Sequence, residues 1–214
     1  MKHELNAQPA CFKEAWPSQL KIFSWFDYIT AIPQAMIVIT TWKEGQIPNA
    51  CLNAWTTYTG DAGGYFVILS ISNYNHTYKN ILRASDFVVN FPGIDEFPKC
   101  YKTIENNSDG ADEITSVGLT IEPSKVVDAP RIKECFLNLE CRLGWHRPLH
   151  DGSVWHIFAG EVVHVAIDGS YVQSGTYRRY GSGGFIYNIP SSKNPETGKQ
   201  DNGMVGRIEP VQKI

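Results

Sequence analysis

Two polar stretches at the ends of predicted strands carry the residue types that hold a flat, phosphate-bearing ligand. Residues 49–59 keep a strand-like composition, but they contain more amides and hydroxyls than a core strand tolerates without partners. Residues 70–80 follow a buried strand and lead into a short helical pattern. The free amides of a helix N-terminus favour an anion such as a phosphate. Together the two stretches predict a polar ligand site.

The helical pattern offers several donors for such a ligand. Thr77 or Asn75 is the expected N-cap, and Lys79 and His76 would add donors near a bound phosphate. An ordinary capped helix without a ligand has the same local sequence, so both interpretations stay open. Cys51 is either a ligand contact or a small buried apolar residue, because no base near it in the sequence indicates a nucleophile.

A histidine-rich run further along the chain raises the alternative of a metal-dependent hydrolase. His146 and His150 are four residues apart, and with Asp151 they would suit a metal if they shared a helical face. Pro148 and Gly152 predict a turn instead. We therefore predict no metal site, and elemental analysis of the purified protein tests this.

His156 differs from the other histidines because it lies in the apolar, strand-like segment 154–160. A histidine there is either a hydrogen-bonded structural residue or a donor to an anionic ligand at a redox centre. The run 177–184 is rich in glycine but follows no strand-to-helix pattern, so no dinucleotide fingerprint is predicted. It is either a surface loop or a loop that contacts a phosphate or a ring.

The elements that must position these residues are mostly strands. Apolar and β-branched runs predict strands at 35–41, 65–72 and 87–91, and a turn closed by Gly45 joins the first of them to the polar stretch. Long strands at 135–145 and 154–167 are expected to pair around a polar turn. Further strands are expected at 23–28 and 120–127, and helices at 78–84, 97–104, 111–117 and near Ser170.

Composition limits the classes of protein that fit. The 214 residues, with 43% apolar and 19% charged residues, suffice for one large domain, and a net charge of −3 argues against nucleic acid as a partner. We expect no secretory leader and no membrane span, because no apolar window of about 20 residues occurs. Five cysteines without Cys-x-x-Cys spacing predict reduced thiols and a cytoplasmic protein. We predict one β-barrel or α+β domain over 1–214, with an arm at 1–21 and a tail at 190–214.

The order of several motifs resembles the flavin reductase-like proteins with an FMN-binding split β-barrel, the group that includes flavoredoxin. The resemblance covers about residues 30–190. Its motifs are, in chain order, 35–41 with Gly45 and Asn49, 53–56, 67–72, 77–81, 87–90, and His156 four residues before 160–163.

This resemblance implies a mainly β fold of the split-barrel type with a few peripheral helices, and FMN held non-covalently at a homodimer interface. It places His156 near the flavin ring as the candidate catalytic residue, and 178–187 as the C-terminal loop of longer members. The ring would be lined by Asn53, Ala54, Trp55 and Thr56, beside the candidate Cys51, while Ser70, Ser72, Thr77 and Asn80, with the candidate Lys79, would lie toward the ribityl chain and phosphate.

The chain also departs from the usual pattern of these proteins. The segment 62–65 replaces a Pro-Pro pair, and His76 stands where an arginine is common. Leu52 and Ala54 occupy positions where small hydroxyl residues are frequent.

The activity that the resemblance implies is that of an oxidoreductase, either an NAD(P)H-dependent flavin reductase or a flavoredoxin-type electron carrier. Hydride or electrons would pass from NAD(P)H through FMN to an acceptor that the sequence does not name. Trp55, Tyr180 or Tyr187 would either help to stack the nicotinamide or serve only in packing. The alternative is a non-catalytic split-barrel protein that binds flavin or another planar ligand as a sensor or store.

Overall fold

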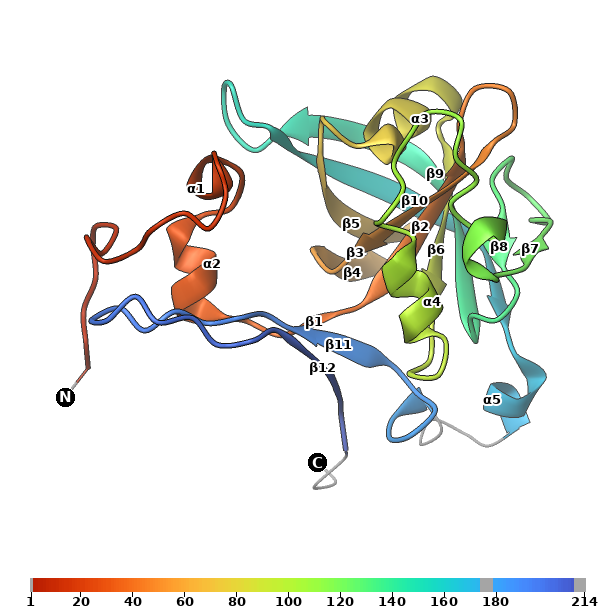
Figure 1. The fold of residues 1–214 in the computed structure, drawn as a ribbon. Coiled ribbons are helices and arrows are strands. Elements are labelled where there is room, and N and C mark those ends of the chain that lie inside the picture. The colour runs from red at the N-terminus through yellow and green to blue at the C-terminus, as the bar shows by residue number, and fades with distance from the viewer. Residues whose placement is uncertain (1, 174–178, 210–214) are drawn as a thin grey trace. The chain divides into compact units, whose positions relative to one another are not determined.

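The computed structural model describes residues 2–173 and 179–209, which fold mostly into antiparallel strands with a few short helices (Figure 1). Its contacts separate two compact units, Met1–Gln34 with Tyr187–Gly206 and Ala35–Ile186 with Arg207–Ile214. No helix within the described ranges is long and apolar enough to cross a membrane.

The larger unit is built on a seven-stranded sheet with the strand order β3-β2-β6-β9-β10-β5-β4. These strands are β2 (Ile37–Trp42), β3 (Pro48–Asn53), β4 (Thr56–Asp61), β5 (Gly64–Ser72), β6 (Asp86–Phe91), β9 (Leu137–Pro148) and β10 (Trp155–Ile167). The remaining elements are α3 (His76–Ala84), α4 (Phe97–Lys102), the 3-10 turn η1 (Thr115–Val117), the paired strands β7 (Ile121–Glu122) and β8 (Arg131–Ile132), and α5 (Gly169–Gln173).

Two predicted hairpins are confirmed. The β2–β3 hairpin pairs Ile39 with Cys51, and Gly45 in its turn adopts φ +75°, a left-handed conformation that glycine reaches without steric cost. The β9–β10 hairpin is longer and contains two register shifts. β10 also pairs with β5, so it joins the long hairpin to the strand that precedes α3.

The main core fills the inner side of the curved sheet. Ile37, Ile39 and Leu69 are fully buried there with Phe87 and other apolar side chains of β5, β6 and β10. Gly160 allows a close approach in this core, because a Cβ at that position would lie only 2.2 Å from a ring carbon of Phe87. The sheet therefore bends around a packed interior, with α3 over one part of it (Figure 1).

The smaller unit contains α1 (Gln19–Ile22), α2 (Trp25–Thr30) and most of a three-stranded sheet of β1 (Gln34–Ala35), β11 (Ile186–Ile189) and β12 (Met204–Arg207). Lys193 is buried, with its ammonium 4.6 Å from the ring centroid of Tyr28 and 5.6 Å from that of Phe12. Strands β11 and β12 and helix α1 were not predicted, and the end of the predicted tail, 210–214, lies outside the described residues.

The strand predicted at 23–28 is wrong, since most of this segment belongs to helix α2. Its start signal is a capping box in which the Ser24 hydroxyl accepts from the Phe26 amide and the Asp27 carboxylate accepts from the Ser24 amide. Aromatic composition favoured a strand, but the cap satisfies two amides that a helix start would otherwise leave free.

The elements predicted at 120–127 and 111–117 are much shorter than expected. Only Ile121–Glu122 pairs as a strand, because the amides of Lys125, Val126 and Val127 donate to the buried Glu140 carboxylate instead of to another strand. Only η1 forms in the second segment, where Asp112 accepts from two following amides and holds a single turn.

Candidate functional site

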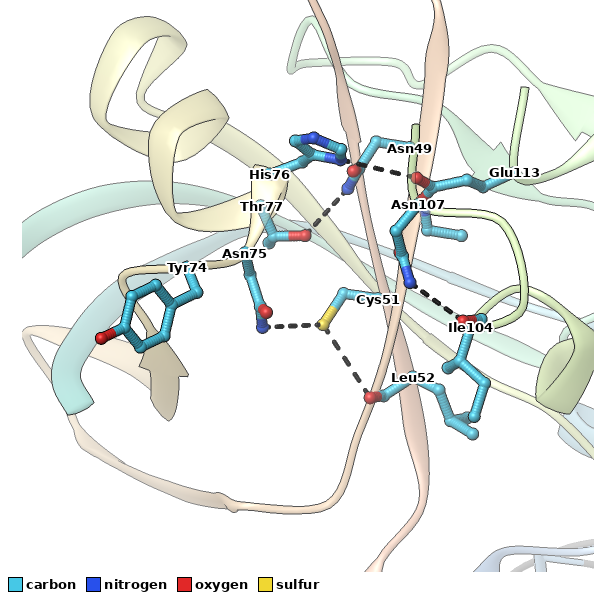
Figure 2. Close-up of a pocket in the computed structure, with 11 residues that line it drawn as sticks. Asn49, Cys51, Leu52, Tyr74, Asn75, His76, Thr77, Ile104, Asn107 and Glu113 are labelled. Carbon is cyan, nitrogen blue, oxygen red and sulfur yellow. Dashed lines mark hydrogen bonds and ion pairs between the residues drawn. The ribbon is translucent and has the colours of Figure 1, made fainter. Parts of the chain in front are cut away.

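A cavity of about 370 Å³ opens beside β3, and we call it the β3 pocket (Figure 2). Its volume lies in the range of small-molecule sites. It is lined by residues 49–52 of β3, residues 74–77 at the start of α3, and Ile104, Asn107 and Glu113 from the connection after α4. The two polar stretches that the sequence singled out therefore meet at one pocket.

Side-chain hydrogen bonds hold the β3 pocket to the sheet. The Asn49 amide donates to the Thr77 hydroxyl at 2.8 Å (Figure 2). It also donates to Thr41 at 3.1 Å, and the Asn80 amide donates to the same Thr41 hydroxyl at 2.9 Å. All four residues are buried. Thr77 and Asn80 thus fix α3 against β2 and β3, so that the first turn of the helix faces the pocket.

The N-terminus of α3 is left without a side-chain cap. Asn75 occupies the N-cap position, but its side chain makes no capping bond, and its amide lies 3.9 Å from the Cys51 sulfur. The amides of the first turn therefore keep their donor capacity for an anion. Of the two predicted N-cap residues, Asn75 is confirmed and Thr77 lies inside the helix, and the expected capping bond is absent.

Cys51 faces this pocket as a neutral thiol. Burial raises its pKa to about 11; a hydrogen bond with Thr77 lowers the pKa, and the Glu113 charge raises it. Because the thiolate is the reactive form, the sulfur is a poor nucleophile at neutral pH. Its place in the lining gives the pocket a contact surface beside the first turn of α3.

A buried ion pair supports one wall of the pocket. The Lys43 ammonium lies 2.7 Å from Glu113 Oε1 and also donates to the carbonyls of Ser108 and Ala111. Glu113, whose side chain is only 2% exposed, accepts from the Ala50 amide as well. These bonds tie the 104–113 connection to β2 and β3.

A second cavity, of about 420 Å³, lies along α3, and we call it the α3 pocket. Its lining comes from the turn after β2 (Lys43, Glu44 and Ile47), from one face of α3 (His76, Lys79, Asn80 and Arg83), and from Asp109 and Gly110. Lys79 and Asn80 therefore line this cavity and not the β3 pocket. His76 lines both cavities.

A third group of predicted residues gathers where β3, β4 and β5 adjoin. The Asn53 amide donates to the Ser70 carbonyl at 3.1 Å, and the Ser70 amide donates to the Trp55 carbonyl at 2.9 Å. The Trp55 ring packs on Trp155, with centroids 5.1 Å apart. Two further candidates complete the group: Ala54 is buried, and Ser72 pairs with Trp155 across the strands.

His156 points to the opposite face of β10 from Trp155, because successive side chains of a strand alternate. Its ring lies 4.9 Å from the Tyr78 ring of α3 and 6.0 Å from the His146 ring of β9. Burial, and then the charge of His146, lower the pKa of His156. The imidazole is therefore held toward its neutral form, which can both donate and accept hydrogen bonds.

Three buried polar atoms in this region have no hydrogen-bond partner among the described residues. Buried polar groups in native proteins are nearly always bonded, so each such atom indicates a position that a ligand or water fills. Cross-strand partners share a face of the sheet, and each of the three residues pairs with a fully buried core residue. The atoms are Asn53 Oδ1 opposite Ile37, Thr56 Oγ1 opposite Leu69, and His156 Nδ1 opposite Ile71.

The sequence analysis missed several residues of these pockets. Glu113, Asn107 and Ile104 come from a connection that carries no recognisable motif. His146 appeared there only as a partner for His150, yet the register of the β9–β10 hairpin brings its ring beside His156. The predicted pairing of the two long strands, together with the alternation of side chains along a strand, was sufficient to place His146 and His156 on the same face.

Two further features from the sequence are the histidine-rich run and the glycine-rich run 177–184. Within the described ranges, no group of three or more His, Cys, Asp or Glu side chains could hold a metal ion. His150 is exposed, and its Nδ1 lies 3.0 Å from the Asp151 carbonyl. Of the glycine-rich run 177–184, residues 177 and 178 lie outside the described residues.

Comparison with known proteins identifies the class of this fold. A protein from Shewanella frigidimarina NCIMB 400 with a split barrel domain superposes with a TM-score of 0.71 at 16% identity, covering 88% of this chain and 89% of that one. Flavoredoxin of Desulfovibrio vulgaris (Miyazaki F) gives 0.63 at 19% identity, covering 85% and 90%. The predicted mainly β, split-barrel fold is therefore confirmed.

The sequence family follows from residues 29–183, which match the model of the flavin reductase like domain. The chain belongs to this family. A protein from Aquifex aeolicus (strain VF5) is 35% identical over 107 residues, which are 48% of this chain and 53% of that protein. The chain spans about half the length of the curated relatives that it matches.

Proposed function

We propose that the chain binds FMN non-covalently and works as an oxidoreductase between a reduced nicotinamide nucleotide and a second electron acceptor. The observation that carries the proposal is the set of unpartnered polar atoms of Asn53, Thr56 and His156 on the core-facing side of three strands. A flavin ring has several donors and acceptors along its edge, so it would satisfy such atoms. Membership of the flavin reductase like family agrees with this chemistry.

The residues present fit the parts of FMN in different ways. The uncapped first turn of α3 offers backbone donors to a phosphate, and His76 adds a side-chain donor. Asn53, Ala54, Trp55 and Thr56, with Cys51 beside them, are the proposed ring contacts. Ser70, Ser72 and Thr77 are proposed to lie toward the ribityl chain and phosphate.

When bound, FMN supplies the hydride and electron chemistry. The chain's own residues bind and orient it. His156, held toward its neutral form, would offer Nδ1 as a hydrogen-bond partner without adding a charge. Asn53, anchored to the Ser70 carbonyl through its amide nitrogen, would keep its carbonyl oxygen in a fixed position.

The chief test is an absorption spectrum of the protein with added FMN, followed by anaerobic addition of NADH or NADPH. We expect a protein-bound flavin spectrum that bleaches on reduction. A protein that takes up no FMN contradicts the whole proposal. Uptake of FMN without reduction by either nucleotide favours the alternative of a non-catalytic flavin sensor or store.

A matched pair of variants tests the ring contacts. Thr56→Val removes the unpartnered hydroxyl, and we expect FMN affinity to fall about fivefold to tenfold, as for one lost hydrogen bond. Thr57→Val changes an exposed neighbour of the same type and should leave the affinity within about twofold. Equal losses in both variants would remove Thr56 from the site.

The proposal includes a homodimer, with FMN at its interface, in the cytoplasm. Its support is the resemblance of the motifs to flavoredoxin-type proteins. Light scattering of the FMN-loaded protein would give the mass of a dimer, whereas a monomer that retains FMN with full affinity would contradict this part.

A further inference from the structure

The α3 pocket differs in charge from the β3 pocket beside it. Lys79 and Arg83, one turn apart on α3, line the α3 pocket with Lys43. Two carboxylates, Glu44 and Asp109, line it as well. The described lining of the β3 pocket instead contains a carboxylate, Glu113, and no lysine or arginine.

The cationic side chains of the α3 pocket differ in how many of their donors bond to the protein itself. Lys43 uses its donors on Glu113 and two backbone carbonyls, so it is structural. Arg83 donates through one terminal nitrogen to the Trp42 carbonyl and lies 3.8 Å from Glu44 through the other, which leaves further N–H donors. Lys79 makes no hydrogen bond or ion pair with any described residue.

The two pockets adjoin at His76. Its Nε2 lies 2.8 Å from Asp109, and its Nδ1 lies 3.7 Å from Glu113, the carboxylate seen beside it in Figure 2. The Asp109 side chain is 97% exposed, and among the described residues the imidazole of His76 is its partner at the edge of the α3 pocket. An anion that reached this pocket would replace an exposed carboxylate and meet two cations with free donors.

We infer that the α3 pocket is a second phosphate site, which receives a nucleotide phosphate beyond the one that FMN itself carries. The inference rests on the proposed function, because it places the flavin phosphate at the β3 pocket. A phosphate next to the bound flavin has two chemical sources. It belongs either to the adenylate half of a flavin dinucleotide, FAD, or to the 2′-phosphate of NADPH. Lys79 and Arg83 hold it in both cases, as charge-assisted donors.

The experiment compares ligand pairs that differ by this phosphate. FMN and FAD are titrated by quenching of flavin fluorescence, and NADPH and NADH are titrated on the FMN-loaded protein, for the native chain and for Lys79→Gln. We expect the affinity for FAD, or for NADPH, to fall about tenfold, as for the loss of one charge-assisted contact. The affinity for FMN and for NADH should stay within about twofold.

The pair that responds identifies the source of the phosphate. A change in the ratio of FAD to FMN affinity assigns the pocket to the flavin dinucleotide, and a change in the ratio of NADPH to NADH assigns it to the 2′-phosphate. Unchanged ratios in both pairs overturn the inference. A parallel loss of FMN and FAD affinity also overturns it, because the pocket would then hold the flavin's own phosphate.

Two further variants keep the test independent of folding. Lys102→Gln, an exposed lysine on α4 outside both pockets, is the matched control and should change neither ratio. Asp109→Asn removes the competing carboxylate and should raise affinity for the responding ligand by about twofold to fivefold. A lowered affinity in Asp109→Asn would contradict the arrangement.

A further titration distinguishes failure of the proposed function from failure of this inference. If the native protein bound neither FMN nor FAD, calorimetry with ADP would test the α3 pocket alone. Binding that Lys79→Gln weakens and Lys102→Gln preserves would support a phosphate site there, and no binding of ADP would overturn it.

Discussion

Asn90 and Asn53 lie on strands of the same sheet, both buried, yet their side chains are bonded to very different extents. Asn90 donates to the Val38 carbonyl and the Thr40 hydroxyl, each at 2.9 Å. Its oxygen accepts from the Ile132 amide at 3.0 Å and from the Asn138 amide at 2.9 Å. Every strong hydrogen-bonding position of this side chain is therefore filled by the protein.

Asn53 is only half satisfied. Its amide nitrogen donates to Ser70, but its buried oxygen has no partner among the described residues. The Thr56 hydroxyl and His156 Nδ1 share this condition. Leaving a buried polar atom unbonded costs about 1–3 kcal/mol, so three such atoms are expected where a ligand supplies the bonds.

The comparison separates two uses of the same residue type. The closed network around Asn90 joins β6 to β2, β8 and β9, and its role is structural. The unbonded atoms of Asn53, Thr56 and His156 form no hydrogen bond that stabilises the fold. A ligand that bonded to them would gain binding free energy, which is why the proposed function rests on them.

The largest expected effect concerns the thiol that shares β3 with Asn53. At pH 8 a pKa of about 11 leaves about one Cys51 in a thousand as thiolate, so its alkylation by iodoacetamide should be about 200-fold slower than in the unfolded chain. Mass spectrometry of the modified peptide measures this rate. Rapid alkylation of the folded protein would show that Cys51 is reactive, and it would support a nucleophilic role for this thiol.

The closed network predicts the largest loss of stability. Asn90→Ala leaves the buried Ile132 amide without its acceptor and removes one of the two acceptors of the Asn138 amide, so we expect the free energy of unfolding to fall by about 3 kcal/mol. Asn53→Ala, which loses one bond, should lower it by about 1 kcal/mol or less. Urea denaturation measures both, and similar losses would break the comparison.

Ligand affinity should show the reverse order. Asn53→Ala is expected to weaken FMN binding about tenfold, because it removes the oxygen that lacks a protein partner. Asn90→Ala, measured at a temperature where it is folded, should keep the affinity within about twofold, since its bonds are internal. If Asn90→Ala lost FMN binding but kept its stability, Asn90 would be a binding residue and the contrast with Asn53 would be wrong.

The smallest expected effect is on the titration of His156. His146→Asn removes a charge that lowers the pKa of His156, so this pKa should rise, while burial keeps it below the ordinary value of about 6.5. Two-dimensional NMR of the imidazole protons measures the shift. A constant pKa would mean that burial alone sets it, and a pKa that falls would contradict the sign of the effect given to His146.

The same shift has a defined sign for stability. Between the folded pKa of His156 and about 6.5 the unfolded chain binds more protons than the folded one. The contribution of His156 to stability is therefore fully present above about pH 6.5, and it is lost as the pH falls through the folded pKa. Replacing His156 by Gln should flatten the pH dependence of urea denaturation in that window.

Local patterns predicted much of the fold. The strands of the β2–β3 and β9–β10 hairpins, helix α3 and the short α5 were expected near their observed positions, because alternation, turn residues and capping signals act over a few residues. Helix α2 was missed although its capping box is local, since the aromatic side chains of this segment favoured a strand.

The candidate site was predicted less completely. Cys51 and Thr77 do share a pocket, but Lys79 lines the neighbouring one, because two residues along an α-helix turn a side chain by about 200° around the axis. Glu113 carries no motif, and it reaches the pocket only because the 104–113 connection folds back onto β3.

What the sequence by itself determined is the two hairpins, helix α3, the polar stretches at 49–59 and 70–80, and the family that they resemble. The tertiary structure alone decided which polar groups are satisfied. Val38, Thr40, Ile132 and Asn138, which fill the hydrogen bonds of Asn90, lie 42 to 52 residues away along the chain. Ser70, which accepts from the Asn53 amide, lies 17 residues away. A sequence shows that an asparagine is present, but only the packed sheet shows whether other strands fill its hydrogen bonds or leave one open for a ligand.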